Sequence, residues 1–125
     1  MLVVEPSDIF REFLDVIVDH AGYDVVTVAA GVTAQHQLEH QRFDMVILAS
    51  AKLGRGPDPL ELARRAADAG AAVMFVLDDW SQCSAFADSG YVILTKPFMP
   101  SALIAEIERL RRQHVIDCEP RQAAQ

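Results

Sequence analysis

The sequence contains little cysteine and no long apolar segment. Its 125 residues include only two cysteines, Cys83 and Cys118, which do not form a C-x-x-C pair. A disulfide framework needs more cysteines, and a membrane helix needs about 20 consecutive apolar residues. A secretory signal is not evident either. We therefore expect a cytoplasmic protein that neither spans nor binds a membrane.

Positive charge is also scarce, since 11 Lys and Arg residues stand against 18 Asp and Glu residues, for a net charge of −7. Nucleic-acid binding requires clustered cations that neutralise phosphates. The densest basic cluster is Arg109, Arg111 and Arg112, and each arginine has Glu106 or Glu108 three or four residues before it. This spacing on a helix favours ion pairs on a solvated face. We expect no nucleic-acid binding by this domain.

Apolar residues, which make up 51% of the chain, occur in an alternating pattern. Short runs rich in Val, Ile and Leu, typical of strands covered on both faces, lie at residues 2–4, 24–28, 45–48, 72–77 and 91–94. A stretch compatible with a helix follows each run. Five such units predict an α/β fold, a doubly wound five-stranded parallel sheet with helices on both faces.

The first predicted helix has clear signals at both ends, with Ser7 as its N-cap and Gly22 as its stop. Ile9, Phe13 and Ile17 recur at helical spacing and predict its buried stripe, with Phe10, Leu14 and Ala21 beside them.

The other helices differ in how clearly they are marked. The second, at about 33–41, is only weakly amphipathic, whereas the third begins at Asp58-Pro59 and closes near Gly70. The last helix begins at Pro100, and its apolar residues Leu103, Ile104, Ile107 and Leu110 follow helical spacing. Residues 115–125 show no periodicity. We expect a domain over 1–114, followed by a frayed tail or the start of a linker.

Chemistry in such a sheet is expected at the carboxyl ends of the strands. The residues that follow the predicted strands at this edge include Glu5, Pro6, Ala49, Asp78, Asp79, Lys96 and Pro97. Neither a G-x-x-x-x-G-K-S/T loop nor a G-x-G-x-x-G turn is present, so the two common modes of nucleotide binding are not expected.

Four segments carry a resemblance to a known family. Residues 2–8 (LVVEPSD), 21–26 (AGYDVV), 44–48 (DMVIL) and 96–98 (KPF) resemble the receiver domain of two-component response regulators, and the resemblance covers about residues 2–113. It implies a five-stranded parallel sheet of the flavodoxin-like, receiver type. It also implies an aspartate at the end of the third strand that accepts a phosphoryl group from a histidine kinase with the help of Mg²⁺.

The resemblance places Ala49 at the phosphoacceptor position, and a methyl group cannot accept a phosphoryl group. Of the two acids that usually hold the metal, Glu5 remains as a weak candidate ligand and Pro6 replaces the other. Mg²⁺ needs more carboxylate oxygens than Glu5 supplies. We therefore expect no cofactor, with Mg²⁺ binding weak or lost.

The switch residues implied by the resemblance are changed as well. Asp78 stands where the family has a hydroxyl at the end of the fourth strand, and Ile93 stands at the aromatic switch position. Lys96 is retained, and the family has a cis peptide bond before Pro97. We predict that Lys96 pairs with Asp78 or Glu5. The stretch 78–96 is shorter than the family pattern by roughly one helical turn, which predicts a short fourth helix.

These features favour a pseudo-receiver, a non-enzymatic signalling domain that acts by protein–protein interaction in a bacterial two-component or phosphorelay pathway. A histidine kinase or another regulator would be its partner, and a homodimer stays open. Two alternatives use the pocket around Asp78, Asp79 and Lys96, namely an atypical phosphoacceptor and a small-molecule sensor.

The sequence offers one candidate metal site, because His36 and His40 share a helical face. No third ligand is evident from the pattern, so solvated histidines are favoured over a zinc site.

Overall fold

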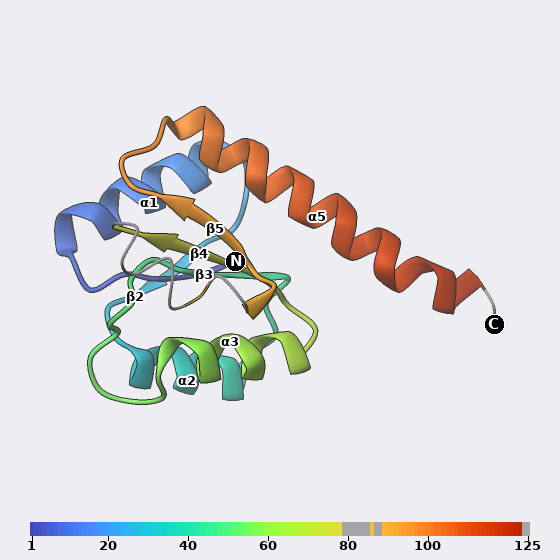
Figure 1. The fold of residues 1–125 in the computed structure, drawn as a ribbon, viewed down its shortest axis with the longest axis horizontal. Helices are drawn as coiled ribbons and strands as arrows, with labels where there is room; N and C mark the ends of the chain where they lie inside the picture. The colour runs from blue at the N-terminus through green and yellow to red at the C-terminus, as the bar shows by residue number, and fades with distance from the viewer. Residues whose placement is uncertain (79–85, 87–88, 124–125) are drawn as a thin grey trace.

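A computed structural model describes residues 1–78, 86 and 89–123 of the chain. Its sheet has five parallel strands in the order β2-β1-β3-β4-β5. The strands are β1 (Leu2–Val4), β2 (Val26–Val28), β3 (Met45–Leu48), β4 (Ala72–Leu77) and β5 (Val92–Thr95). Figure 1 shows helices on both faces of this sheet. The predicted doubly wound α/β architecture is confirmed.

The helices divide the core into two layers. On one face, α1 (Asp8–His20) and α5 (Pro100–Ala123) cover side chains such as Met74 and Val76. On the other, α2 (Gly31–His40) and α3 (Pro59–Asp68) cover side chains such as Phe75 and Leu77. Successive residues of β4 thus enter opposite layers, which explains why its apolar run is continuous.

Local end signals place the helices as the sequence predicted. The Ser7 hydroxyl accepts a hydrogen bond from the Phe10 amide, and the Asp58 carboxylate accepts one from the Glu61 amide. Gly22 has a φ of +94° beyond the end of α1, a conformation that favours glycine. The Ser7 cap and the Gly22 turn set where α1 begins and ends.

The buried stripe predicted for α1 is correct only in part. Leu14 and Val18 are fully buried, whereas Ile9 is 85% exposed and Phe13 is also exposed. Ala21 is the C-cap and is exposed. The helix carries two neighbouring apolar rows, and contact with the sheet and α5 selects the row of Leu14 and Val18 as the buried one.

Two strands differ slightly from their predicted ranges. Strand β2 begins at Val26, because it pairs only with β1, which spans Leu2–Val4. Strand β5 runs from Val92 to Thr95, one residue later than predicted, in register with Met74–Leu77 of β4.

The C-terminal segment also differs from its prediction, since the backbone of α5 continues to Ala123 and extends beyond the sheet (Figure 1). The domain boundary at 114 stays a prediction.

Most of the short fourth helix expected in the stretch 78–96 lies outside the described residues. Within the described part of the chain, no helix combines the length and apolar character that a membrane crossing requires.

Candidate functional site

Four strand ends bring the predicted pocket together at the carboxyl edge of the sheet. Backbone hydrogen bonds continue the strand pairing there, from the Ala49 amide to the Val4 carbonyl at 2.8 Å and from the Lys96 amide to the Leu77 carbonyl at 2.8 Å. Glu5, at the end of β1, bonds through its amide to the β2 carbonyl of Val28. The backbone thus aligns Glu5, Ala49 and Lys96.

The Lys96 ammonium lies at the centre of this group. Its Nζ is 3.4 Å from Glu5 Oε1, 3.2 Å from Asp78 Oδ1 and 3.0 Å from the Ala49 carbonyl oxygen. It also lies 4.1 Å from the centre of the Phe10 ring, a cation–π distance. The predicted pairing of Lys96 is confirmed, with both carboxylates as partners.

The two carboxylates have different environments. The Glu5 side chain is 4% exposed and the Lys96 side chain 15%, whereas the Asp78 side chain is 57% exposed. Water screens the Asp78 interaction, so it contributes little. Separation of a buried pair costs more, because it leaves one charge without compensation in a low-dielectric setting. The Glu5–Lys96 pair therefore dominates the electrostatics of this site.

Glu5 is incompletely satisfied among the described residues. Its Oε1 faces Lys96, but no hydrogen-bond partner in the described part of the chain reaches Oε2. Burial raises the pKa of the Glu5 carboxyl, and the nearby Lys96 charge opposes this rise. Glu5 thus holds a proton more readily than an ordinary glutamate does.

The raised pKa of Glu5 predicts that the stability of the protein depends on pH, and that Glu5→Gln removes this dependence. Because the pKa of Glu5 is higher in the fold than its ordinary value of 4.5, its contribution to stability is complete below that value. It is lost as pH rises through the pKa of the folded state. We expect the stability of the wild type relative to Glu5→Gln to fall as pH increases above 4.5. Urea unfolding of both proteins across this range measures the difference, and parallel curves would contradict the prediction.

Mg²⁺, which the resemblance implies, does not fit these residues. Octahedral coordination needs several oxygen ligands about 2.0–2.1 Å from the ion. Pro6 and Ala49 supply no side-chain oxygen, and Lys96 already holds the Ala49 carbonyl and one oxygen of Glu5. Among the described residues, the pocket then retains Glu5 Oε2 and the exposed Asp78 carboxylate, which is paired with Lys96, and these supply too few ligands for a magnesium site.

The other residues predicted for the site differ in their burial. The Ala49 methyl is fully buried, and Pro6 and Pro97 are exposed. The peptide bond between Lys96 and Pro97 is cis. Ile93 is half-buried against the core layer on the α2 and α3 face. Asp79 lies outside the described residues.

The sequence prediction missed the aromatic wall of the site. Phe10 lies under Lys96, and its ring contacts Phe98 edge-on at 5.9 Å and Phe13 at 5.5 Å. The only signals in the sequence were the place of Phe10 in the first turn of the helix after Glu5 and the place of Phe98 after Pro97. Neither reveals a contact between them.

An exposed apolar surface continues outward from this aromatic wall. Ile9, Phe13 and Val16 lie at helical spacing on α1, and all three are exposed. Phe98 contacts Phe13 at 6.3 Å, and the next residue, Met99, is exposed as well. We call Ile9, Phe13, Val16 and Met99 the α1 patch. Clustered exposed apolar side chains of this kind are typical of protein-binding surfaces.

The strand order and the placement of the helices invite comparison with known structures. A response regulator receiver protein from Sinorhizobium medicae WSM419 aligns with a TM-score of 0.80 at 20% identity, over 90% of this chain and 94% of that one. A CheY-like receiver domain protein from Methanospirillum hungatei JF-1 gives 0.79 at 18% identity, over 93% and 95% of the two chains. This chain has the receiver fold.

The same fold occurs in the signal receiver domain of a signal transduction histidine kinase from Syntrophus aciditrophicus. Its TM-score is 0.76 at 24% identity, and the alignment covers 90% of this chain and 89% of that one. No protein-family model and no curated protein matches the sequence. The shared receiver fold therefore rests on structure, and the chemistry of the site must be argued from this chain's own residues.

Proposed function

We propose that this chain is a pseudo-receiver, a cytoplasmic signalling domain that is not phosphorylated and not an enzyme. It acts by binding a protein, such as a histidine kinase or another regulator, in a bacterial two-component or phosphorelay pathway. The receiver fold supports a role in this kind of signalling. The loss of phosphotransfer is inferred from the residues at the strand ends.

One observation carries the proposal, namely that the Lys96 ammonium is neutralised within the protein. Glu5, Asp78 and the Ala49 carbonyl surround it within 3.4 Å. With Ala49 at the acceptor position, the end of β3 offers no side-chain nucleophile there, and a phosphoryl group would meet the negative charges of Glu5 and Asp78. Such an arrangement favours one stable pocket over a phosphorylation-driven switch.

The α1 patch supports binding as the mode of action. It places exposed apolar side chains beside the aromatic wall of the pocket, and such surfaces gain free energy when a partner covers them. Control would then come from the abundance of the domain or of its partner.

Treatment with acetyl phosphate and Mg²⁺ tests the proposal. We expect the intact mass to stay unchanged, because Ala49 offers no nucleophile and the site does not fit the metal. A receiver protein with an aspartate acceptor, treated in parallel, verifies the phosphodonor. Amide chemical shifts around Asp78 and Ile93 should also stay unchanged when Mg²⁺ and beryllofluoride are added.

A mass increase of one phosphoryl group would contradict this function. If the increase disappeared in Asp78→Asn, an atypical acceptor at Asp78 would replace the pseudo-receiver proposal. If it mapped to residues 44–56, phosphotransfer at the end of β3 would have survived by another group, such as Ser50. The Ser50 hydroxyl is engaged in a turn, where it donates to the Lys52 carbonyl at 2.9 Å.

A further inference from the structure

Helix α2 carries three metal-ligating side chains on one exposed face, remote in sequence from the Lys96 pocket. His36, Glu39 and His40 occupy positions i, i+3 and i+4, which lie beside one another on a helix surface. One ligand atom from each lies within 4.8 Å of the others, and all three residues are exposed. The third ligand that the histidine pair lacked in the sequence pattern is therefore Glu39.

The geometry orients one histidine for coordination. His40 Nδ1 lies 2.7 Å from the backbone carbonyl oxygen of His36. A carbonyl only accepts hydrogen bonds, so Nδ1 carries the proton and Nε2 keeps its lone pair. Metal-bound histidines commonly make this same contact through their second nitrogen, because it sets the tautomer and the ring direction.

The side chains of His36 and Glu39 also lie close to the positions that metal coordination requires. The His36 and His40 rings have centres 4.2 Å apart with planes inclined at 37°. The Glu39 carboxylate accepts a hydrogen bond at 3.2 Å from the side-chain amide of Gln35, which lies four residues earlier on the helix. This bond restricts the orientation of the Glu39 side chain. Zinc binds these ligand atoms at about 2.0–2.2 Å, so small rotations of exposed side chains bring them into contact with one ion.

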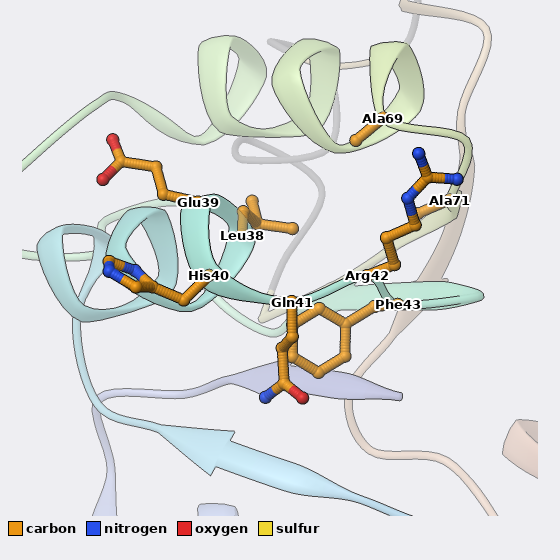
Figure 2. Close-up of a pocket in the computed structure, with 8 residues that line it drawn as sticks. All are labelled: Leu38, Glu39, His40, Gln41, Arg42, Phe43, Ala69 and Ala71. Carbon is orange, nitrogen blue, oxygen red and sulfur yellow. The ribbon is translucent and has the colours of Figure 1, made fainter.

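We propose that α2 binds a divalent first-row transition metal, with Zn²⁺ as the probe, through the two imidazoles of His36 and His40 and the carboxylate of Glu39. Imidazole and carboxylate ligands suit such ions. Three protein ligands leave a fourth tetrahedral position open. Glu39 and His40 also border a hollow of about 300 Å³ between α2 and the end of α3, lined in addition by residues such as Leu38, Phe43 and Ala71 (Figure 2).

Calorimetric titration with ZnCl₂ tests the site, in a background where Cys83 and Cys118 are replaced by serine so that thiolates do not compete. We expect saturable binding of one ion per chain. His36→Ala and His40→Ala should each weaken binding at least tenfold, and Glu39→Gln should weaken it less. The matched control is His20→Ala, which removes another exposed histidine at the end of α1 and should leave binding unchanged.

Imidazole nitrogen chemical shifts provide a second readout, since Zn²⁺ should move the Nε2 signal of His40 and leave that of His20 in place. Because His20, His36, Glu39 and His40 are all exposed, their variants should keep the fold of the parent protein, which circular dichroism verifies. The proposal is overturned if both histidine variants bind Zn²⁺ as the parent does, if His20→Ala abolishes binding, or if no saturable binding occurs up to about 1 mM. None of these outcomes bears on the pseudo-receiver function, which depends on other residues.

Discussion

Lys96→Met is expected to lower the free energy of unfolding by about 3–5 kcal/mol at pH 8, since it leaves the Glu5 carboxylate buried without its cation. The Glu5 side chain is 4% exposed, and Lys96 Nζ is its charged partner in the described structure. Methionine keeps most of the apolar stem, so the lost charge is the main change. Urea unfolding measures the effect, which should shrink at pH 5 because protonation of Glu5 removes the unpaired charge.

Two further variants distinguish the contribution of the buried Glu5–Lys96 pair to stability from that of the exposed Asp78–Lys96 pair. Asp78→Asn should cost less than about 1 kcal/mol, because its carboxylate is 57% exposed and screened by water. Adding Glu5→Gln to Lys96→Met should restore much of the stability, since neither charge then remains unpaired. Equal losses for Asp78→Asn and Lys96→Met would show instead that the pocket depends on the exposed pair.

Leu14→Ala is expected to destabilise the protein by about 2–5 kcal/mol, the usual cost of deleting a buried leucine side chain. Leu14 is fully buried between the sheet and α5. The matched variant Ile9→Ala, on the same helix, should change stability by no more than about 0.5 kcal/mol, because Ile9 is 85% exposed. Thermal or urea unfolding measures both.

This comparison tests which apolar row of α1 faces the core. If Ile9→Ala cost as much as Leu14→Ala, the exposed α1 patch would be part of the core and unavailable to a partner. The expected result instead assigns separate roles to the two rows, with Leu14 and Val18 stabilising the fold and Ile9 and Phe13 left for binding.

The sequence by itself determined the layer architecture and the membership of the pocket. Alternating strand and helix signals predict parallel strands, and the carboxyl ends of parallel strands meet at one edge. Glu5, Ala49 and Lys96 each follow a strand directly, so their convergence needed no knowledge of side-chain packing. The ion pair of Lys96 followed because a cation at that edge had only carboxylates to neutralise it.

The tertiary structure decided which of these side chains are buried. Glu5 and Asp78 both follow strands and are both acidic, yet the Glu5 side chain is buried beside Lys96 while the Asp78 side chain is exposed. Likewise, either apolar row of α1 satisfied helical periodicity. The positions of the sheet and α5 selected the row of Leu14 and Val18, because burial depends on which neighbour covers a face.

The loop after β3 shows most clearly the difference between what the sequence predicts and what the tertiary structure decides. Its glycines and prolines indicate a turn-rich segment, but the sequence does not reveal that this loop caps α2. Ala30 offers no capping side chain, and the amides of Gly31 and Val32 instead donate to the Leu53 and Arg55 carbonyls at 2.7 Å each. The approach is so close that a Cβ atom on Gly56, where φ is +112°, would lie 2.5 Å from the Val32 amide nitrogen. Helix ends must satisfy their free amides, and here only the folded chain could supply carbonyls more than 20 residues away in sequence to do so.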